Sequence, residues 1–212
     1  MAEVRAGAFG KVKLVRGLCY KPRKSIGKTS GPSKPPDSVD FDLWCGPAPS
    51  GPLHRKNFHY DWHWQWDFGN GDLGNQGIHQ MDVARWGLGK NELSREVISL
   101  GGRFGYIDDG ETANTQMIVF NYSDSKLIFE VRGLPTMPYR GAMVGNVFHC
   151  ADGYLVIPSY SGAIAYNKDG EVVQRFNGAR DHFQNFVEAV RSRRREHLKG
   201  EVLEGHLSSA LC

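Results

Sequence analysis

NTQMIVFNYSDSKLIFEVR, residues 114–132, contains two runs of β-branched and aromatic residues with a short polar turn between them. Such runs are typical of β-strands, and the sequence Ser-Asp-Ser is typical of a hairpin turn. In the second run polar residues alternate with apolar ones, so one face of that strand is more polar than the other. The segment predicts two antiparallel strands within a larger sheet.

Strand patterns recur on both sides of this hairpin. They cover residues 11–18, 95–104, 146–149, 154–157, 163–166 and 172–176. A helix pattern covers residues 73–88, and another begins near Asp181, where Gln184 completes a capping box. Many strands between few helices are typical of an α+β fold. We expect one large open, mainly antiparallel β-sheet with helices on one face.

Length and composition limit the class of protein. The chain has 212 residues, 40% of them hydrophobic, which is enough for a single domain over residues 1–212. We expect this domain to be truncated at both ends, because residues 1–8 and 204–212 resemble incomplete helices. No apolar run approaches the roughly 20 residues that a membrane helix needs. A net charge of +3 without a recognised binding motif argues against nucleic acid as a partner.

The four cysteines lie far apart, and none belongs to a C-x-x-C pair. Zinc and redox sites need closely spaced thiols, so we expect these cysteines to be buried and reduced. No apolar stretch that resembles a secretory signal follows Met1. We expect a cytoplasmic protein.

A long loop over residues 21–56 is rich in Pro, Gly, Ser and Lys. The first 60 residues carry eleven Lys and Arg residues against four Asp and Glu residues. One interpretation is a solvated loop, and the other is a loop that faces a phosphate or an acidic substrate. Under the second interpretation Tyr20, Lys21 and Arg23 contact the substrate.

Aromatic residues are concentrated in positions 57–68, where Trp62, Trp64 and Trp66 alternate with charged or polar residues. In one interpretation these side chains fill a core. In the other, Trp62 and Trp64 form a platform on which the apolar face of a sugar ring stacks.

The same block contains alternating histidine and aspartate residues. On a strand, His59, Asp61 and His63 would share one face and could bind a metal, with His54 or His79 as a fourth ligand. A polar stripe that lines a wet pocket is the simpler explanation. Nothing else in the chain demands a metal, so we expect none.

Residues 69–74, GNGDLG, match the pattern G-x-G-x-x-G that opens the helix of a dinucleotide site. In such a site a buried hydrophobic strand leads directly into the glycines. Residues 61–67 are too polar and aromatic for a strand of that kind. We expect no nucleotide site within this chain.

The helix that follows these glycines has one polar and aromatic face. Asn75, His79, Asp82 and Trp86 fall at i, i+4, i+7 and i+11, opposite an apolar stripe that starts at Ile78. Imidazole titrates near neutral pH, so His79 suits proton exchange with a substrate hydroxyl, and Asp82 is placed to orient its ring. A structural histidine is the alternative.

Residues 71–86, GDLGNQGIHQMDVARW, resemble the glycine–Asp–x-x-x–His–x-x–Asp helix of the Gfo/Idh/MocA oxidoreductases. Residues 42–48 and 182–192 resemble further segments of that family. The resemblance implies an N-terminal Rossmann domain for NAD or NADP, which this chain lacks. It also implies that this chain is the open-sheet domain that follows, of the same type as the C-terminal domain of glyceraldehyde-3-phosphate dehydrogenase.

The resemblance also implies roles for residues of the helix. The family's usual catalytic Asp stands four residues before the histidine, and Asn75 occupies that position here. An amide cannot accept a proton as a carboxylate can, but it can hydrogen-bond a sugar hydroxyl. We therefore assign proton transfer to His79, substrate orientation to Asn75, and substrate contacts to Asp72 and Asp82.

The implied activity of the complete protein is hydride transfer between a nicotinamide and a carbinol carbon of a sugar, polyol or related carbohydrate. We expect this chain alone to be inactive. Two other functions stay open. One is a glycosidase of the same family that oxidises its substrate transiently with NAD. The other is a non-catalytic ligand-binding or assembly module.

The strand at residues 114–122 also predicts self-association. Met117 and Val119 lie on one of its faces, Ile118 and Phe120 on the other, so both faces are largely apolar. The predicted helices cover only one side of the sheet. We expect a homodimer, or a tetramer built from such dimers, that buries the open face against a second copy.

Overall fold

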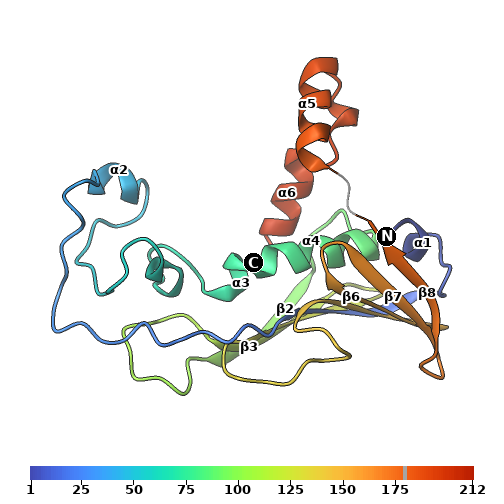
Figure 1. Cartoon of the computed structure of the whole chain (residues 1–212), viewed down its shortest axis with the longest axis horizontal. Helices are drawn as coiled ribbons and strands as arrows, with labels where there is room; N and C mark the ends of the chain where they lie inside the picture. The colour runs from blue at the N-terminus through green and yellow to red at the C-terminus, as the bar shows by residue number, and fades with distance from the viewer. Residues whose placement is uncertain (179–180) are drawn as a thin grey trace.

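The computed structural model describes residues 1–178 and 181–212, and its centre is an eight-stranded sheet (Figure 1). The strand order is β2-β3-β4-β1-β5-β6-β7-β8. The strands are β1 (Val12–Cys19), β2 (Glu96–Gly102), β3 (Thr115–Asn121), β4 (Lys126–Arg132), β5 (Val144–Cys150), β6 (Gly153–Ser159), β7 (Gly162–Asn167) and β8 (Val172–Asn177). Neighbouring strands are antiparallel except β1 and β4, which are parallel. The predicted open, mainly antiparallel sheet is confirmed, and each predicted strand segment belongs to it.

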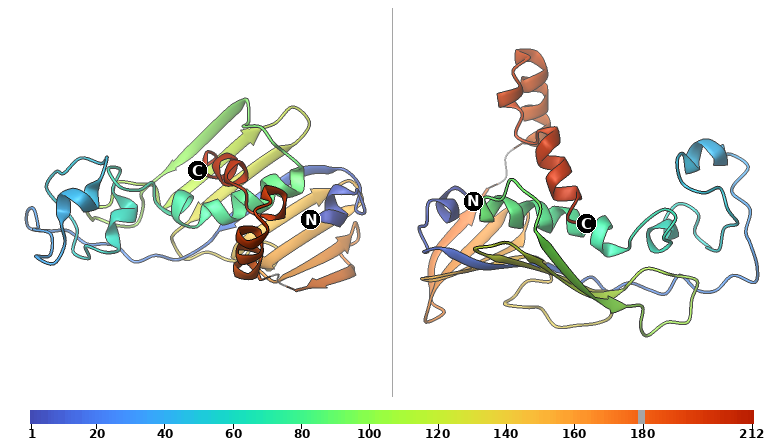
Figure 2. Two further views of the ribbon diagram at one scale, coloured as in Figure 1. Left: turned by 90° about the horizontal axis from the view of Figure 1, so that it is seen from above. Right: turned by 180° about the vertical axis from the view of Figure 1, so that it is seen from behind.

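The helices lie on one face of the sheet or beyond its end (Figures 1 and 2). They are α1 (Ala2–Arg5), α2 (Phe41–Cys45), η1 (Asp61–Trp64), α3 (Asp72–Asn75), α4 (Gly77–Leu88), α5 (His182–Ser192), η2 (Arg195–His197) and α6 (Val202–Ser209). α4 packs on β1, β4 and β5, and α6 packs on α4. None of the described helices is long and apolar enough to cross a membrane.

α4 lies close to the sheet because two glycines leave room for the ring of Phe129. A Cβ atom at Gly17 of β1 would lie 2.7 Å from that ring, and one at Gly77 would lie 2.9 Å from it. Met81 and Ala84 continue the side of α4 that faces the sheet, and both are fully buried. This packing determines which side chains of α4 face away from the sheet.

The helix predicted over residues 73–88 is divided at Gln76 into α3 and α4. Gly89 ends α4 with a φ of 66°, the left-handed conformation that glycine adopts without strain. Ile78 was expected in the buried stripe. It is only partly buried and lines a groove instead.

The long loop predicted over residues 21–56 is part of an ordered lobe that extends beyond the end of the sheet (Figure 2). Arg55 is buried within it. Its guanidinium lies 4.9 Å from the ring centre of Trp44, 4.8 Å from that of Phe58 and 4.9 Å from that of Phe68. The aromatic side chains therefore surround a buried cation and fill the interior of the lobe.

The aromatic block forms η1 and not a strand, which was the condition for a shared polar face there. His59, Asp61 and His63 consequently do not share a strand face. His63 Nδ1 lies 2.5 Å from the carbonyl oxygen of Tyr60, and Asp61 accepts a backbone hydrogen bond within the block. The aromatic rings pack on one another instead of on the two faces of a sheet. Among the described residues, no group of three or more His, Cys, Asp or Glu side chains is placed to hold a metal ion.

The face of the sheet opposite α4, here called the open face, is covered only in part. Leu18, Val147 and Val156 are buried there against residues 139–143, in the connection between β4 and β5. Towards the β2 edge, Ile98 and Leu100 stay exposed.

A buried ionic cluster lies on the open face beside these apolar residues. Glu130 accepts hydrogen bonds from Arg16 at 2.5 Å, from Tyr20 at 2.9 Å and from Arg132 at 2.8 Å. Burial and the hydrogen bond to Glu130 raise the pKa of Tyr20 to about 12. The polar face predicted for β4 is thus a set of paired charges, with its carboxylate out of contact with water.

Candidate functional site

An arginine and a carboxylate fix the start of α3. Arg23 donates from Nε and Nη2 to the two oxygens of Asp72, at 2.8 and 2.6 Å. Asp72 is the first residue of α3 and only 2% exposed. The hydrogen bonds between Arg23 and Asp72 raise the pKa of Arg23. Both side chains were predicted to contact the substrate, but they bind each other, and Asp72 is out of reach of a ligand.

The same guanidinium joins α3 to the aromatic lobe. Its Nη1 donates to the hydroxyl of Tyr60 at 2.9 Å, and its central carbon lies 5.6 Å from the ring centre of Trp64. Trp64 is buried, so it offers no free face to a sugar. Trp62 stacks on His63 with ring centres 3.8 Å apart, which occupies one of its faces. The predicted tryptophan platform is therefore largely used by the protein itself.

Asn75 is exposed, and its orientation is set from within the protein. Its Nδ2 donates to an oxygen of Asp72 at 3.1 Å. This bond uses one of the two N–H groups of the amide, and the carbonyl oxygen remains to accept a hydrogen bond from a ligand hydroxyl. A relay from Arg23 through Asp72 fixes this acceptor at the end of α3.

His79 lies on the exposed side of α4, beside a tyrosine from the turn between β6 and β7. Its ring meets that of Tyr160 edge to face, with centres 5.5 Å apart and planes at 70°. Gln76 donates from Nε2 to the hydroxyl of Tyr160 at 2.8 Å. Because the hydroxyl oxygen accepts here, its O–H can still donate to a ligand. No sequence pattern indicates this contact, which joins residues 84 positions apart.

Asp82 contacts α6, and the structure does not bring it to His79. Its carboxylate accepts from Ser208 Oγ at 2.6 Å, and Ser208 accepts from Nε of Arg85 at 2.9 Å. Arg85 is buried and also binds Glu204. Within the described chain, Asp82 anchors α6 to α4, and the ring of His79 is positioned by Tyr160 instead.

A groove of about 1050 Å³ opens beside these residues. One wall is the exposed side of α4, with His79, Asp82 and Trp86, and Tyr160 adds a hydroxyl to it. The other wall is the segment 195–209, which contains η2 and α6 and carries charges of both signs. The groove is large enough for a sugar-sized ligand and has the polar groups that bind hydroxyls.

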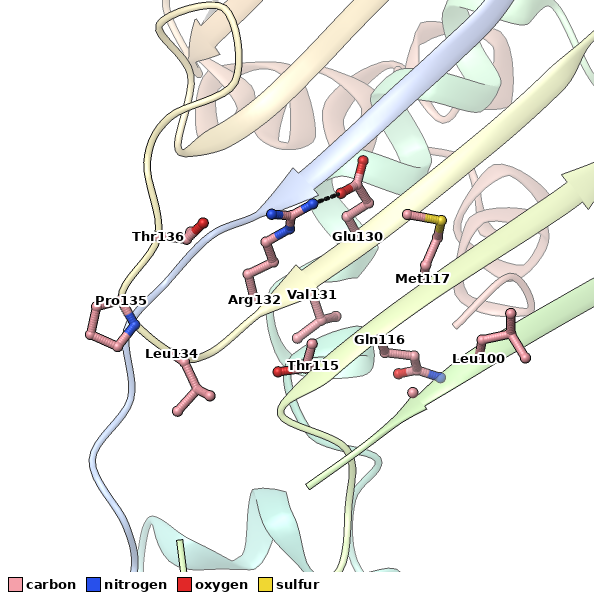
Figure 3. Close-up of a pocket in the computed structure, with 11 residues that line it drawn as sticks. Leu100, Thr115, Gln116, Met117, Glu130, Val131, Arg132, Leu134, Pro135 and Thr136 are labelled. Atoms are coloured by element: carbon pink, nitrogen blue, oxygen red, sulfur yellow. Dashed lines mark hydrogen bonds and ion pairs between the residues drawn. The ribbon is translucent and has the colours of Figure 1, made fainter. Parts of the chain in front are cut away.

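Two of the predicted contact residues lie elsewhere. Tyr20 points to the open face, where it binds Glu130, so it is not near His79. Lys21 is exposed on the chain between Tyr20 and Arg23. A shallow depression of about 440 Å³ on the open face is lined by β2, β3, β4 and residues 134–136, and Figure 3 shows the pair of Arg132 and Glu130 in it. It lies on the far side of the sheet from α4.

The glycine pattern at residues 69–74 does not fit a nicotinamide dinucleotide. Gly71 has a φ of 72° and precedes α3, which has only four residues. The element before the glycines is η1 and not a β-strand. A dinucleotide pyrophosphate binds at the N-terminus of a full helix that follows a buried strand.

Fold and site together define an open-faced α/β domain with a polar groove on its helical side. The family model of the Gfo/Idh/MocA oxidoreductases that describes their C-terminal alpha/beta domain matches residues 11–212. The chain belongs to this oxidoreductase family and represents its C-terminal domain.

Solved structures share the fold. A Thermotoga maritima protein assigned as an oxidoreductase is 16% identical, with a TM-score of 0.64, over 99% of this chain and 53% of that one. The WlbA dehydrogenase from Bordetella pertussis, solved with NADH and UDP-GlcNAcA, is 14% identical, with a TM-score of 0.58, over 99% and 52%. A Desulfitobacterium hafniense protein assigned as an NADPH-dependent oxidoreductase is 10% identical, with a TM-score of 0.63, over 99% and 54%. The chain thus spans about half the length of these structures. Among curated proteins, none matches it.

Proposed function

We propose that this chain is the substrate-binding half of an NAD(P)-dependent oxidoreductase that acts on a sugar, polyol or related carbohydrate. One observation carries the proposal. His79 is exposed beside the groove, with Tyr160 against its ring, and α3 next to it presents the oriented carbonyl oxygen of Asn75. An acid–base group with a hydrogen-bond acceptor and a hydroxyl donor suits a ligand that carries several hydroxyls.

In this reaction the residues of the chain move one proton and orient the substrate. Nε2 or Nδ1 of His79 takes the proton of the reacting hydroxyl, and the same nitrogen returns it in the reverse direction. The Oδ1 atom of Asn75 accepts a hydrogen bond from a neighbouring hydroxyl and holds the carbinol carbon in place. The cofactor, NAD or NADP, supplies the hydride acceptor and is held by the other half of the protein.

Carbohydrate is the substrate class that the groove favours. Its walls combine the rings of Tyr160, Trp86 and His79 with charged groups of both signs. A sugar could therefore stack its ring on an aromatic side chain and hydrogen-bond its hydroxyls to polar ones. Among the structures that share this fold, the WlbA dehydrogenase was solved with a nucleotide-linked sugar derivative.

The test is turnover by the enzyme that contains this chain together with its nucleotide-binding half. With NAD or NADP and a panel of polyols, aldoses and sugar acids, reduced cofactor should form with at least one substrate. The 212-residue chain alone should neither bind cofactor in calorimetry nor turn over. Hydrolysis of glycosides without net cofactor reduction would point to the redox glycosidase instead, and no reaction with any substrate would favour a non-catalytic module.

We also propose that two copies pair through the open face. The exposed apolar residues along β2 and β3 support this, because a soluble monomer rarely leaves such a patch uncovered. For the compartment we propose the cytoplasm, where thiols stay reduced, since all four cysteines are free.

A further inference from the structure

α5 carries an apolar stripe that nothing in the described chain covers. Phe183, Phe186, Val187 and Val190 follow each other at i, i+3, i+4 and i+7, which places them on one face of the helix. Phe183 is 74% exposed and Phe186 is 60% exposed. No residue of α5 is buried. A helix with this pattern normally turns its apolar face to a core.

α5 and the chain that follows it form one hydrogen-bonded unit. The side chain of Asp181 accepts from the N–H of Gln184 at 3.0 Å and caps the first turn. Asn185 binds the carbonyl oxygen of His197 at 2.7 Å and the N–H of Lys199 at 3.0 Å, so the chain after α5 folds back along it. α5 has 11 residues, and isolated helices shorter than about 12–15 residues are marginal in water. Covering the stripe would supply the stability that the helix lacks by itself.

The stripe lies on the same side of the sheet as His79. α6 packs on α4, and α5 stands beyond α6, pointing away from the sheet (Figures 1 and 2). The groove beside His79 has the segment 195–209 as its second wall, and that segment includes η2, which contacts α5. A protein domain that binds over the groove at His79 would therefore contact the unit formed by η2 and α5.

We infer that the apolar stripe of α5 is the docking surface for the nucleotide-binding half of the oxidoreductase. The inference rests on the proposed function, which requires a nicotinamide, and the half that holds it, over His79. The Thermotoga structure supports the size of this occupant, since this chain covers only 53% of it and nearly half of that polypeptide lies outside the match. A second copy of this chain is the other occupant to consider. We place that copy on the open face, on the opposite side of the sheet.

Amide hydrogen exchange of residues 182–192 tests the docking directly. It is measured in the 212-residue chain alone and in the protein that contains both halves. We expect these amides to exchange at least about tenfold more slowly when both halves are present, because a docked helix opens less often. Phe186→Ser should remove this protection. Glu188→Ser is the matched control, because Glu188 is exposed on the opposite side of the same helix and the same residue is introduced.

The outcomes separate the inference from the proposed function. Equal exchange of α5 with and without the second half overturns the docking, and so does an equal effect of both serine variants. If the amides of α5 already exchange slowly in the chain alone, and more slowly as its concentration rises, a second copy covers the stripe. This result also overturns the inference. Protection by the second half together with a failure to turn over any carbohydrate keeps the docking and rejects the proposed function. Circular dichroism of both variants verifies that the fold is intact, which is expected because both side chains are exposed.

Discussion

Arg23 donates two hydrogen bonds to Asp72, and the same carboxylate accepts a third from the amide N–H of Asn75. The contact joins the chain that leaves β1 to the first turn of α3, 49 residues later. This contact stabilises the fold and also orients the candidate site. Arg23 holds Asp72 in place, and Asp72 in turn fixes the side-chain carbonyl oxygen of Asn75. Removing the cation from a buried ion pair destabilises the folded protein strongly, because the carboxylate stays buried without a partner.

Removing the guanidinium should destabilise the protein. We expect Arg23→Ala to lower the free energy of unfolding by about 3 kcal/mol, because Asp72 stays buried without its partner. Lys21→Ala, two residues earlier on the exposed chain, should change it by less than about 0.5 kcal/mol. Urea unfolding of the two variants measures the difference. Similar effects of both would mean that the pair contributes little.

A second buried carboxylate should give an acid-dependent contribution to stability. Asp108 accepts two hydrogen bonds from Arg103, at 2.7 and 2.6 Å, and one from Ser25 at 2.8 Å. Burial by itself would raise the pKa of Asp108, but these hydrogen bonds and the charge of Arg103 outweigh it and lower the pKa to about 2. A folded pKa below the unfolded value of about 4 stabilises the protein above pH 4, and this contribution is lost as pH falls through 2.

The variant Asp108→Asn tests the sign. Its free energy of unfolding should lie below that of the wild type at pH 5, and the two should converge as the pH is lowered to 2. Denaturant titrations at pH 5, 4, 3 and 2 measure the difference. A difference that is independent of pH would show that Asp108 acts through packing and not through its charge.

The strands could be predicted from sequence because alternation of polar and apolar residues is a local signal. The same holds for the N-cap of α5, where Asp181 accepts from the N–H of Gln184. The predicted capping box is only half formed, because the side chain of Gln184 donates to Glu188 instead. His79 and Asn75 were proposed as site residues from helical spacing, and the family resemblance implied their roles. Their partners could not be found in this way. Tyr160 reaches His79 only because the turn between β6 and β7 is brought to α4 by the sheet.

Two sequence patterns had a different physical origin from the one inferred. Alternating tryptophans at 57–68 left open a platform for a sugar ring, but Phe58 packs with Trp44 around Arg55, so these rings fill the interior of a lobe. Helical spacing placed Asp82 near His79, which is geometrically possible. Ser208, 126 residues away in sequence, binds that carboxylate instead. Spacing gives the face of a helix, and tertiary contacts decide which partner a side chain on that face binds.

Tyr160 should affect substrate binding through its hydroxyl and proton transfer through its ring. Tyr160→Phe keeps the edge-to-face contact with His79, so kcat should hold while KM rises a few-fold through loss of one hydrogen bond. Tyr160→Ala frees the imidazole as well and should lower kcat about tenfold or more. Steady-state kinetics of the enzyme with both halves separates the two effects. Wild-type kinetics for both variants would exclude Tyr160 from the site.

His79→Ala should lower kcat by about 10² to 10⁴, the usual contribution of a general base. The affinity for NAD or NADP, measured by calorimetry, should hardly change, because the proposed mechanism gives His79 a contact with the substrate only. His206→Ala, an exposed histidine on α6, is the control and should keep full activity. A His79 variant with wild-type kcat at saturating substrate would remove this residue from the mechanism.

Asn75→Asp restores the carboxylate that the family usually has at this position. We expect no large gain in turnover, and a loss of stability, because the new carboxylate would replace a donor 3.1 Å from Asp72 and face a like charge. Kinetics together with urea unfolding measures both effects. A strong rise in kcat would show that the wild-type amide limits proton transfer and would revise the assignment to His79.

The open face should pair two copies of the chain, and two neighbouring residues of β2 allow a matched test. Ile98 pairs with Val119 on the open face, whereas Val97 pairs with Phe120 on the face that carries α4. The two side chains are about equally exposed, at 51% and 53%.

An aspartate at Ile98 would place a charge in the interface between copies, where its desolvation is costly. We expect Ile98→Asp to shift the protein from dimer or tetramer to smaller species at tens of micromolar, and Val97→Asp to leave its size unchanged. Light scattering coupled to gel filtration measures both. A stable wild-type monomer at these concentrations would show that the loop over residues 139–143 and the Glu130 cluster cover the open face sufficiently by themselves.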